Sequence, residues 1–218
     1  MWRRILAWLF PVACIGCGYP GVALCAGCAP PPEEASTFAF SGVPVWAAGS
    51  YGGSLQAAML AMKRGERAYL EAFVPLFACA PVGEGTIVPL PTSVRRRRGR
   101  GFDQAVELAR GVAAARGLAV AEVLENRGNA QHGRTRFARL RARGRFRVRR
   151  GAVVPARVVL LDDVCTTGAT LADAIAVLRS AGCEVEGALV VARTPPGRNQ
   201  RLRGMVLADE PHAKGVHT

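Results

Sequence analysis

Apolar and polar positions follow two different periods in the second half of the chain. Residues 157–161 and 185–192 are short, nearly unbroken apolar runs, typical of strands that are buried on both faces of a parallel sheet. Between them, apolar side chains recur at helical spacing at Leu171, Ala174, Ile175, Leu178 and Ala181. Gly182 then ends the stripe. The order strand, helix, strand predicts a βαβ unit, and with it an α/β fold whose twisted sheet is mostly parallel and flanked by helices.

Weaker patterns upstream supply further elements of this fold. Short strands are expected at residues 42–50 and 86–88. Helices are expected at residues 55–62 and 102–115, because apolar residues recur there every three or four positions. A chain of 218 residues has room for one α/β domain and one or two small appendages.

Composition changes along the chain divide it into three expected parts. Residues 1–40 carry a cysteine cluster and end in the stiff, polar linker of residues 30–34. Residues 41–195 carry the alternating strand and helix patterns and form the α/β domain. Residues 196–218 are polar, basic and weakly patterned, so we expect a flexible tail.

The first twelve residues have two arginines followed by an apolar run, as a signal peptide does. Pro11 interrupts the run, which is too short to cross a bilayer. Cleavage or lipidation at Cys14 or Cys17 would also destroy the cysteine cluster. We therefore favour an amphipathic lead-in helix that packs on the cysteine module, and no other segment approaches transmembrane length.

Four of the seven cysteines fall within fifteen residues, at Cys14, Cys17, Cys25 and Cys28. An odd and clustered count does not fit a secreted disulfide framework, so we expect a reducing, cytoplasmic location. Each Cys-x-x-Cys pair has glycine at its third position, which allows the tight turn that directs two thiolates at one ion. Two such pairs predict a tetrahedral Zn²⁺ site with no open position, and therefore a structural role for the metal. The alternative is buried thiols or disulfides.

The most informative motif follows the predicted strand at residues 157–161. Asp162 and Asp163 stand at its carboxyl end, then comes a loop of small and hydroxyl residues, and then a helix. Backbone N–H groups at a helix N-terminus bind anions, and carboxylates accept hydrogen bonds from sugar hydroxyls or hold Mg²⁺ through water. This combination predicts a site for a phosphorylated pentose. An ordinary helix cap explains Thr170 but not the aspartate pair.

Basic residues exceed acidic ones by 29 to 16, giving a formal net charge of +13 and a pI of about 10.6. This excess favours anionic partners. The arginine usage that is common in proteins from a GC-rich genome explains the excess equally well. Residues 95–100 hold five arginines after the Pro89-Leu90-Pro91 turn and fit either phosphate binding or a solvated, nucleic-acid-contacting loop. Residues 134–150 interleave arginines with apolar residues, among them Phe146. That pattern fits single-stranded DNA bound through Arg139, Arg141 and Arg143, and equally a lid over a polyanionic substrate.

The segment from Val158 to Thr170 resembles the phosphoribosyl-pyrophosphate signature of type I phosphoribosyltransferases. The chain, from the cysteines to about residue 194, is similar to the ComF family of competence-associated, phosphoribosyltransferase-like bacterial proteins. Tyr51-Gly52, Lys63, Pro89-Leu90-Pro91 and Arg100-Gly101-Phe102-Asp103-Gln104 resemble family segments. Two residues depart from the pattern, because Asp103 replaces an asparagine and Arg134 replaces an apolar residue.

The resemblance implies a role for each part of the site. Asp162 and Asp163 would hold the ribose during displacement at the anomeric carbon. The ribose 5-phosphate loop would consist of Cys165, Thr166, Thr167, Gly168, Ala169 and Thr170, with Cys165 as a small side chain and not a nucleophile. The pyrophosphate side would consist of Pro91, Thr92, Arg96 and Arg100.

Two functions follow from these implied roles. One is a transferase that binds phosphoribosyl pyrophosphate and Mg²⁺, acts on an unknown acceptor and is linked to DNA uptake. The other is a non-catalytic protein that handles single-stranded nucleic acid and uses the same fold as a scaffold or ligand sensor.

Overall fold

The computed structural model describes residues 12–78, 80–92, 103–127 and 144–194. The expected lead-in helix before Val12 and the expected tail therefore lie outside the described residues. The same holds for five of the arginines implied or suggested as ligands, namely Arg96, Arg100, Arg139, Arg141 and Arg143. Within the described part, no helix combines the length and the apolar character that crossing a membrane requires.

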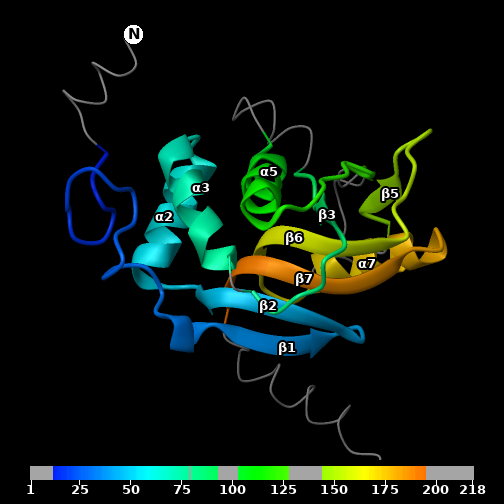
Figure 1. Ribbon diagram of the computed structural model, residues 1–218, viewed down its shortest axis with the longest axis horizontal. Helices are drawn as coiled ribbons and strands as arrows, with labels where there is room; N and C mark the ends of the chain where they lie inside the picture. Colours follow the sequence, from blue (N-terminus) through cyan, green and yellow to red (C-terminus); the bar gives the residue numbers. More distant parts are fainter. Residues whose placement is uncertain (1–11, 79, 93–102, 128–143, 195–218) are drawn as a thin grey trace, which may run out of the picture.

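The central sheet has five strands, with the bounds Ser36–Phe40 (β1), Val43–Ser50 (β2), Thr86–Pro89 (β3), Arg157–Cys165 (β6) and Glu184–Arg193 (β7). Their order across the sheet is β1-β2-β7-β6-β3 (Figure 1). In this sheet β1 runs antiparallel to β2, and the other neighbouring strands are parallel. The prediction of a mostly parallel sheet is confirmed.

The four predicted strands all form, and two features of the sheet were not predicted. β6 continues four residues past Leu161, because Asp162, Val164 and Cys165 still pair with β7. The apolar run stops at the aspartates, so the sequence pattern ended the strand too early. β1 lies at the edge of the sheet, and its side chains alternate between half-buried and exposed, so it leaves no apolar run in the sequence.

One face of the sheet is covered by helices from the first half of the chain. These are Gly53–Lys63 (α2), Arg67–Phe73 (α3), the 3-10 turn Val74–Phe77 (η2) and Gln104–Arg116 (α5). Val159 and Leu161 of β6 belong to the apolar cluster on this side. The predicted helices at residues 55–62 and 102–115 are confirmed, with α5 beginning after its N-cap residue Asp103.

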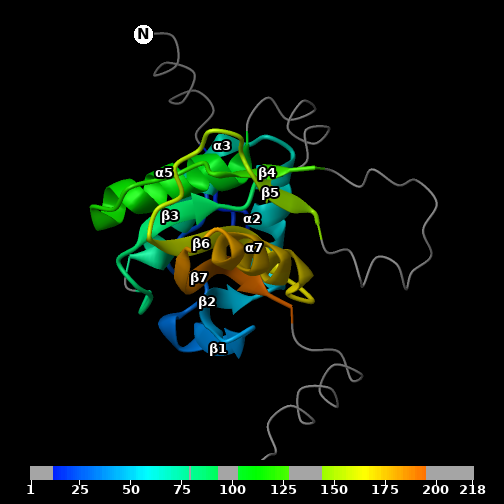
Figure 2. The ribbon, with the colours of Figure 1, turned by 90° about the vertical axis from the view of Figure 1, so that its right-hand side faces the viewer.

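The opposite face is covered by Ala169–Ser180 (α7) and by a two-stranded sheet of Leu124–Asn126 (β4) and Phe146–Val148 (β5) (Figure 2). Val158 and Leu160 of β6 belong to the cluster on this side. Phe146 is only 3% exposed within that cluster, so its ring is not available to stack on a nucleic-acid base. Of the two alternatives left open for residues 134–150, base stacking is therefore excluded for this residue.

The cysteine segment packs on the α/β domain through Ala23, which is buried in the cluster beneath α2 and α3. Part of the expected linker forms a 3-10 turn, Pro32–Glu34 (η1), and β1 begins two residues later. Because β1 pairs along its whole length with β2, residues 36–40 are part of the main sheet. We propose Ala35, and not residue 40, as the boundary of the cysteine module.

Candidate functional site

The carboxyl ends of β3 and β6 meet at one edge of the sheet, since Pro89 pairs with Leu161 and Leu90 donates its N–H to the Leu161 carbonyl at 2.9 Å. Ligands bind at such edges in parallel α/β sheets. The aspartate pair lies within the last four residues of β6, and Pro91 and Thr92 follow β3. The structure therefore brings these four candidate residues to the same edge.

Asp162 and Asp163 are half-buried at the end of β6. Each carboxylate accepts a hydrogen bond at 2.8 Å from the N–H of the next residue. Burial, and then the negative charge of Asp163, raise the pKa of Asp162 well above its ordinary value. Two adjacent carboxylates held this way favour a cation or hydroxyl donors nearby.

Lys63 supplies one such cation. It is the last residue of α2, and its Nζ lies 2.9 Å from a carboxylate oxygen of Asp163, with side chains 28% and 30% exposed. The charge of Lys63 acts against the rise in the pKa of Asp162. Sequence reasoning did not place Lys63 in the site, although it is one of only two lysines in a chain rich in arginine.

The loop after β6, which the resemblance implies as the 5-phosphate site, turns into α7 at a left-handed glycine. Thr166 and Thr167 are exposed, while Gly168 is buried in the left-handed region at φ 72° and caps α7. A Cβ atom on Gly168 would lie 2.2 Å from the Phe40 ring, so this ring packs directly on the loop. The Ala169 N–H reaches Thr167 Oγ1 at only 3.4 Å.

The first turn of α7 contains no acidic residue, and its N-cap residue makes no side-chain hydrogen bond. The positive end of the helix therefore has no anionic partner from its own sequence. Together with the exposed hydroxyls of the loop, this gives the chemistry of an anion site.

A second set of contacts ties α7 to β5. Arg145 donates from its guanidinium to Thr170 Oγ1 at 2.7 Å. The two carboxylate oxygens of Asp173 accept the N–H groups of Gly144 at 2.7 Å and Phe146 at 2.8 Å. Neither Arg145 nor Asp173 was a candidate from the sequence, because the contacts join residues 25 to 29 positions apart.

At the residues implied to border pyrophosphate, Thr92 Oγ1 donates to Asp103 Oδ2 at 3.3 Å, and the Pro91 carbonyl accepts from Asn126 Nδ2 at 3.0 Å. Asp103 also accepts the Ala105 N–H at 3.2 Å as the N-cap of α5, and burial raises the pKa of Asp103. Asparagine caps helices equally well, so the exchange of asparagine for Asp103 keeps this structural contact. Arg134, the second departure from the family pattern, lies outside the described residues.

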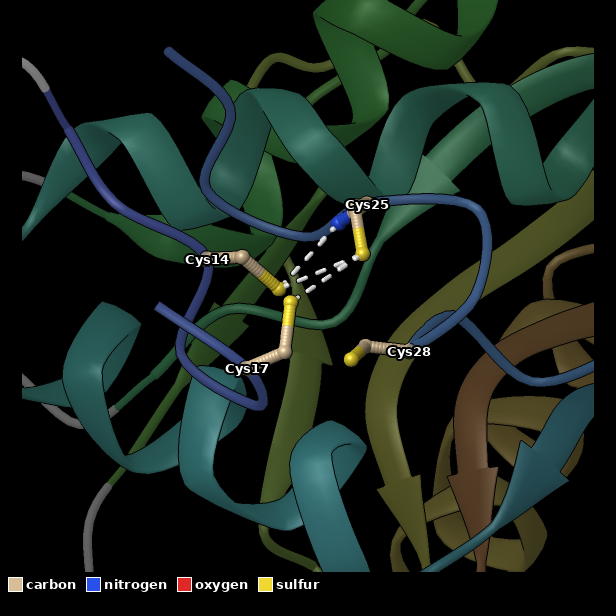
Figure 3. A group of neighbouring side chains, drawn as sticks. All are labelled: Cys14, Cys17, Cys25 and Cys28. Carbon is tan, nitrogen blue, oxygen red and sulfur yellow. Dashed lines mark hydrogen bonds between the residues drawn. The ribbon is translucent and has the colours of Figure 1, made fainter. Parts of the chain in front are cut away.

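The four clustered cysteines converge on one point (Figure 3), and their Sγ atoms all lie within 4.8 Å of one another. Cys25 Sγ lies 3.6 Å from both Cys14 Sγ and Cys17 Sγ. A tetrahedral Zn²⁺ with bonds of about 2.3 Å places its sulfur ligands about 3.8 Å apart, so this arrangement fits zinc. The six described cysteines are free, which excludes disulfides among them.

The electrostatics of the cluster also suit a cation. Backbone N–H groups of Cys25 and Cys17 lower the pKa of Cys14 to about 6, which favours a thiolate there. The pKa of Cys28 is raised to about 12, because its thiol shares hydrogen bonds with the other three cysteines. A bound metal would replace these shared protons. The Ser54 hydroxyl, in the first turn of α2, donates to the Cys28 carbonyl and fixes the module to the domain.

A cavity of about 1130 Å³ lies elsewhere, along the outer side of α7. Its lining includes Ser41, Arg147, Asp173 and Arg179, but neither Asp162 nor Asp163. Arg179 already donates to the Ser41 carbonyl at 3.0 Å, and Arg147 is ion-paired with Glu125. We therefore place the candidate site at the carboxyl edge of the sheet, where the aspartate pair and the N-terminus of α7 lie, and not in this cavity.

No family model matches the chain. Over 102 residues it is 32% identical to "Competence protein ComFC" of Streptococcus pneumoniae (strain ATCC BAA-255 / R6). The match covers 46% of this chain and 44%, less than half, of that relative. Among solved structures, the orotate phosphoribosyltransferase from Aeropyrum pernix matches with a TM-score of 0.39 and 20% identity, over 80% of this chain and 84% of that one. The sequence match confirms the resemblance to ComF proteins that the motifs indicated.

Proposed function

We propose that the chain is a phosphoribosyltransferase-like competence protein that binds phosphoribosyl pyrophosphate and Mg²⁺ at the carboxyl edge of its sheet. The observation that carries the proposal is the position of two half-buried carboxylates beside an uncapped helix N-terminus. Phosphate at the helix, ribose hydroxyls at the carboxylates and a cation beside them account for every unusual feature of this edge. The likeness to a competence protein supports a connection with DNA uptake.

Each group has a distinct part in the proposed reaction. The N–H groups and hydroxyls of Thr166 to Thr170 hold the 5-phosphate, and Asp162 and Asp163 accept hydrogen bonds from the ribose hydroxyls. Pro91 and Thr92 border the pyrophosphate, with Arg96 and Arg100 as its cationic ligands. When bound, Mg²⁺ would supply positive charge that stabilises the pyrophosphate as a leaving group. Because positive charge develops on the ribose ring during displacement, the fixed carboxylates also stabilise the transition state.

The aspartate pair carries more negative charge than its neighbours balance. Lys63 is the cation that the described residues place against Asp163, and in the same part of the chain no lysine or arginine is ion-paired with Asp162. Hard oxygen ligands with an excess of negative charge suit Mg²⁺ held directly or through water.

Zn²⁺ has a different role in this proposal. We assign it to Cys14, Cys17, Cys25 and Cys28, where four thiolates would leave the metal no open coordination position. The metal would therefore hold the module together and not take part in chemistry. Four free, metal-binding thiols also support a reducing, cytoplasmic location.

Calorimetric titration tests the ligand. Wild-type protein should bind phosphoribosyl pyrophosphate with Mg²⁺, and the double variant Asp162→Asn/Asp163→Asn should bind about a hundredfold more weakly, because charge-assisted hydrogen bonds contribute roughly 1.5–3 kcal/mol each. The matched control is Glu107→Gln/Glu122→Gln, which removes two surface carboxylates that pair with Arg110. A wild type that gives no binding at millimolar ligand would make the pocket a scaffold.

The second candidate function is handling of single-stranded nucleic acid. The likeness to a competence protein and the net charge of +13 favour it. If Arg139, Arg141 and Arg143 track a phosphate backbone, their joint replacement by alanine should lower both the affinity for single-stranded DNA and its salt dependence. Unchanged binding in the triple variant would favour the lid interpretation of this stretch.

A further inference from the structure

We propose that Arg145 is a further phosphate-binding residue of this pocket, and that Asp173 positions it. The inference rests on the proposed function and adds a cationic ligand for the 5-phosphate group, contributed by the residue that precedes β5 and not by the loop itself. Three observations carry it: the place of the guanidinium, the lack of a carboxylate partner, and the way in which its backbone is fixed.

The guanidinium lies at the wrong end of a helix for its charge. It donates at 2.7 Å to Thr170 Oγ1, and Thr170 is the second residue of α7. Helix N-termini carry partial positive charge and normally attract acidic residues, yet the first turn of α7 has none. A cation placed against a positive helix end is stabilised once an anion binds between them. Thr170 thus joins Arg145 to the loop that is expected to hold the phosphate.

Arg145 also lacks the neutralising partner that its neighbours have. Arg147 pairs with Glu125, and Arg149 pairs with Glu122 at 3.6 Å. Within the described ranges no carboxylate is paired with Arg145, whose side chain is half-buried and bonded to a neutral hydroxyl. A guanidinium has five N–H donors in a planar fork that matches phosphate oxygens. The free charge and the remaining donors are therefore available to a dianion.

The backbone on both sides of Arg145 is held by one carboxylate. Asp173 is 7% exposed, and its oxygens accept the N–H groups of Gly144 and Phe146, the two residues that flank Arg145. The Phe146 ring is buried in the core at the same point. Because Asp173 belongs to α7, it sets the position of Arg145 relative to the helix end. Arg145 is thus a fixed ligand and not a solvated surface residue.

Ribose 5-phosphate isolates this contact, since it lacks the pyrophosphate. We expect Arg145→Met to weaken binding of ribose 5-phosphate to the zinc-loaded full chain by about 10–100-fold, the usual effect of losing a charge-assisted contact. The matched control, Arg147→Met, removes the same charge two residues away and should change affinity less than about threefold. Arg147 also lines the cavity outside α7, so a ligand bound there would reverse this order.

Asp173→Asn tests the positioning role. It should weaken ribose 5-phosphate binding in the wild type but add little in an Arg145→Met background, because the residue that it positions is already gone. A merely structural Asp173 would lower affinity equally in both backgrounds. If Arg145→Met and Arg147→Met bind ribose 5-phosphate with equal affinity, the role of Arg145 is overturned and the proposed function is unaffected. A wild type that binds neither ribose 5-phosphate nor phosphoribosyl pyrophosphate would overturn the proposed function and this inference together.

Discussion

The contact between Gly168 and Phe40 makes the geometry of the proposed phosphate loop testable by a single methyl group. Gly168→Ala places a Cβ in a residue with φ 72°, which costs about 1–2 kcal/mol for an L-residue. The new Cβ would also lie 2.2 Å from Phe40 Cζ. Forcing an extra methyl into a packed contact costs about 1–3 kcal/mol more. We therefore expect a total loss of about 2–5 kcal/mol in the free energy of unfolding.

The matched control is Gly182→Ala. Gly182 has φ 78°, but nothing lies within 4 Å of an added Cβ, so only the backbone cost of about 1–2 kcal/mol applies. Urea denaturation of both variants gives the two free energies, and calorimetry with ribose 5-phosphate gives the functional effect. Binding should fall in Gly168→Ala and persist in Gly182→Ala.

A double-mutant cycle tests whether Phe40 causes the additional loss. Gly168→Ala should cost less stability in a Phe40→Ala background than in the wild type, because Phe40→Ala removes the atoms that the added methyl meets. Equal destabilisation by Gly168→Ala and Gly182→Ala, with binding kept in both, would refute the idea that Phe40 shapes the loop.

Three further predictions concern the cation sites and pH. Protein purified without added metal should contain about one Zn²⁺ per chain by elemental analysis, and a fully folded, metal-free cysteine module would contradict the assignment. Lys63→Met should strengthen binding of Mg²⁺ alone about fivefold by calorimetry, because an ion pair of about 1 kcal/mol no longer has to be broken at Asp163; weaker binding would show that Lys63 does not compete. Burial raises the folded-state pKa of Asp162 above its ordinary value of 3.8. The contribution of Asp162 to stability is therefore lost as the pH rises from 3.8 through the raised pKa. The side chain in Asp162→Asn does not titrate, so this variant has no such loss. Thermal melts of the ligand-free proteins from pH 4 to 8 should show the melting temperature of Asp162→Asn rising relative to wild type, and a difference independent of pH would contradict the shift.

The parts of the fold that follow from local pattern were predictable. The apolar run from Val158 to Leu161 and the apolar stripe from Leu171 to Ala181 predicted β6 and α7, because buried strands and helices have recognisable apolar periodicity. β1 has no such pattern, since it is an edge strand with side chains that alternate between half-buried and exposed. β4 and β5 have three residues each, too few for a period to be recognised.

The burial of Phe146 has a specific physical cause. Arginine and apolar residues alternate from Arg145 to Val148, which resembles an arginine-aromatic surface for bases. The same alternation is the two-residue period of a strand, with Phe146 directed into the core and Arg147 exposed. Lys63 and Arg145 were missed for another reason. Their partners Asp163 and Thr170 lie on other elements, so only the tertiary fold brings the pairs together.

The N-terminal segment and the α/β domain fold against each other. Pro30 packs on the backbone of Gly49, Ser54 holds the Cys28 carbonyl, and Phe40 supports the loop at Gly168. A chain shortened to begin at residue 41 would lose the edge strand, the ring that packs on the loop at Gly168 and the partner of the Ser54 hydroxyl in one step. Gene fusions and truncations with a junction between Cys28 and Val43 should therefore yield poorly folded protein.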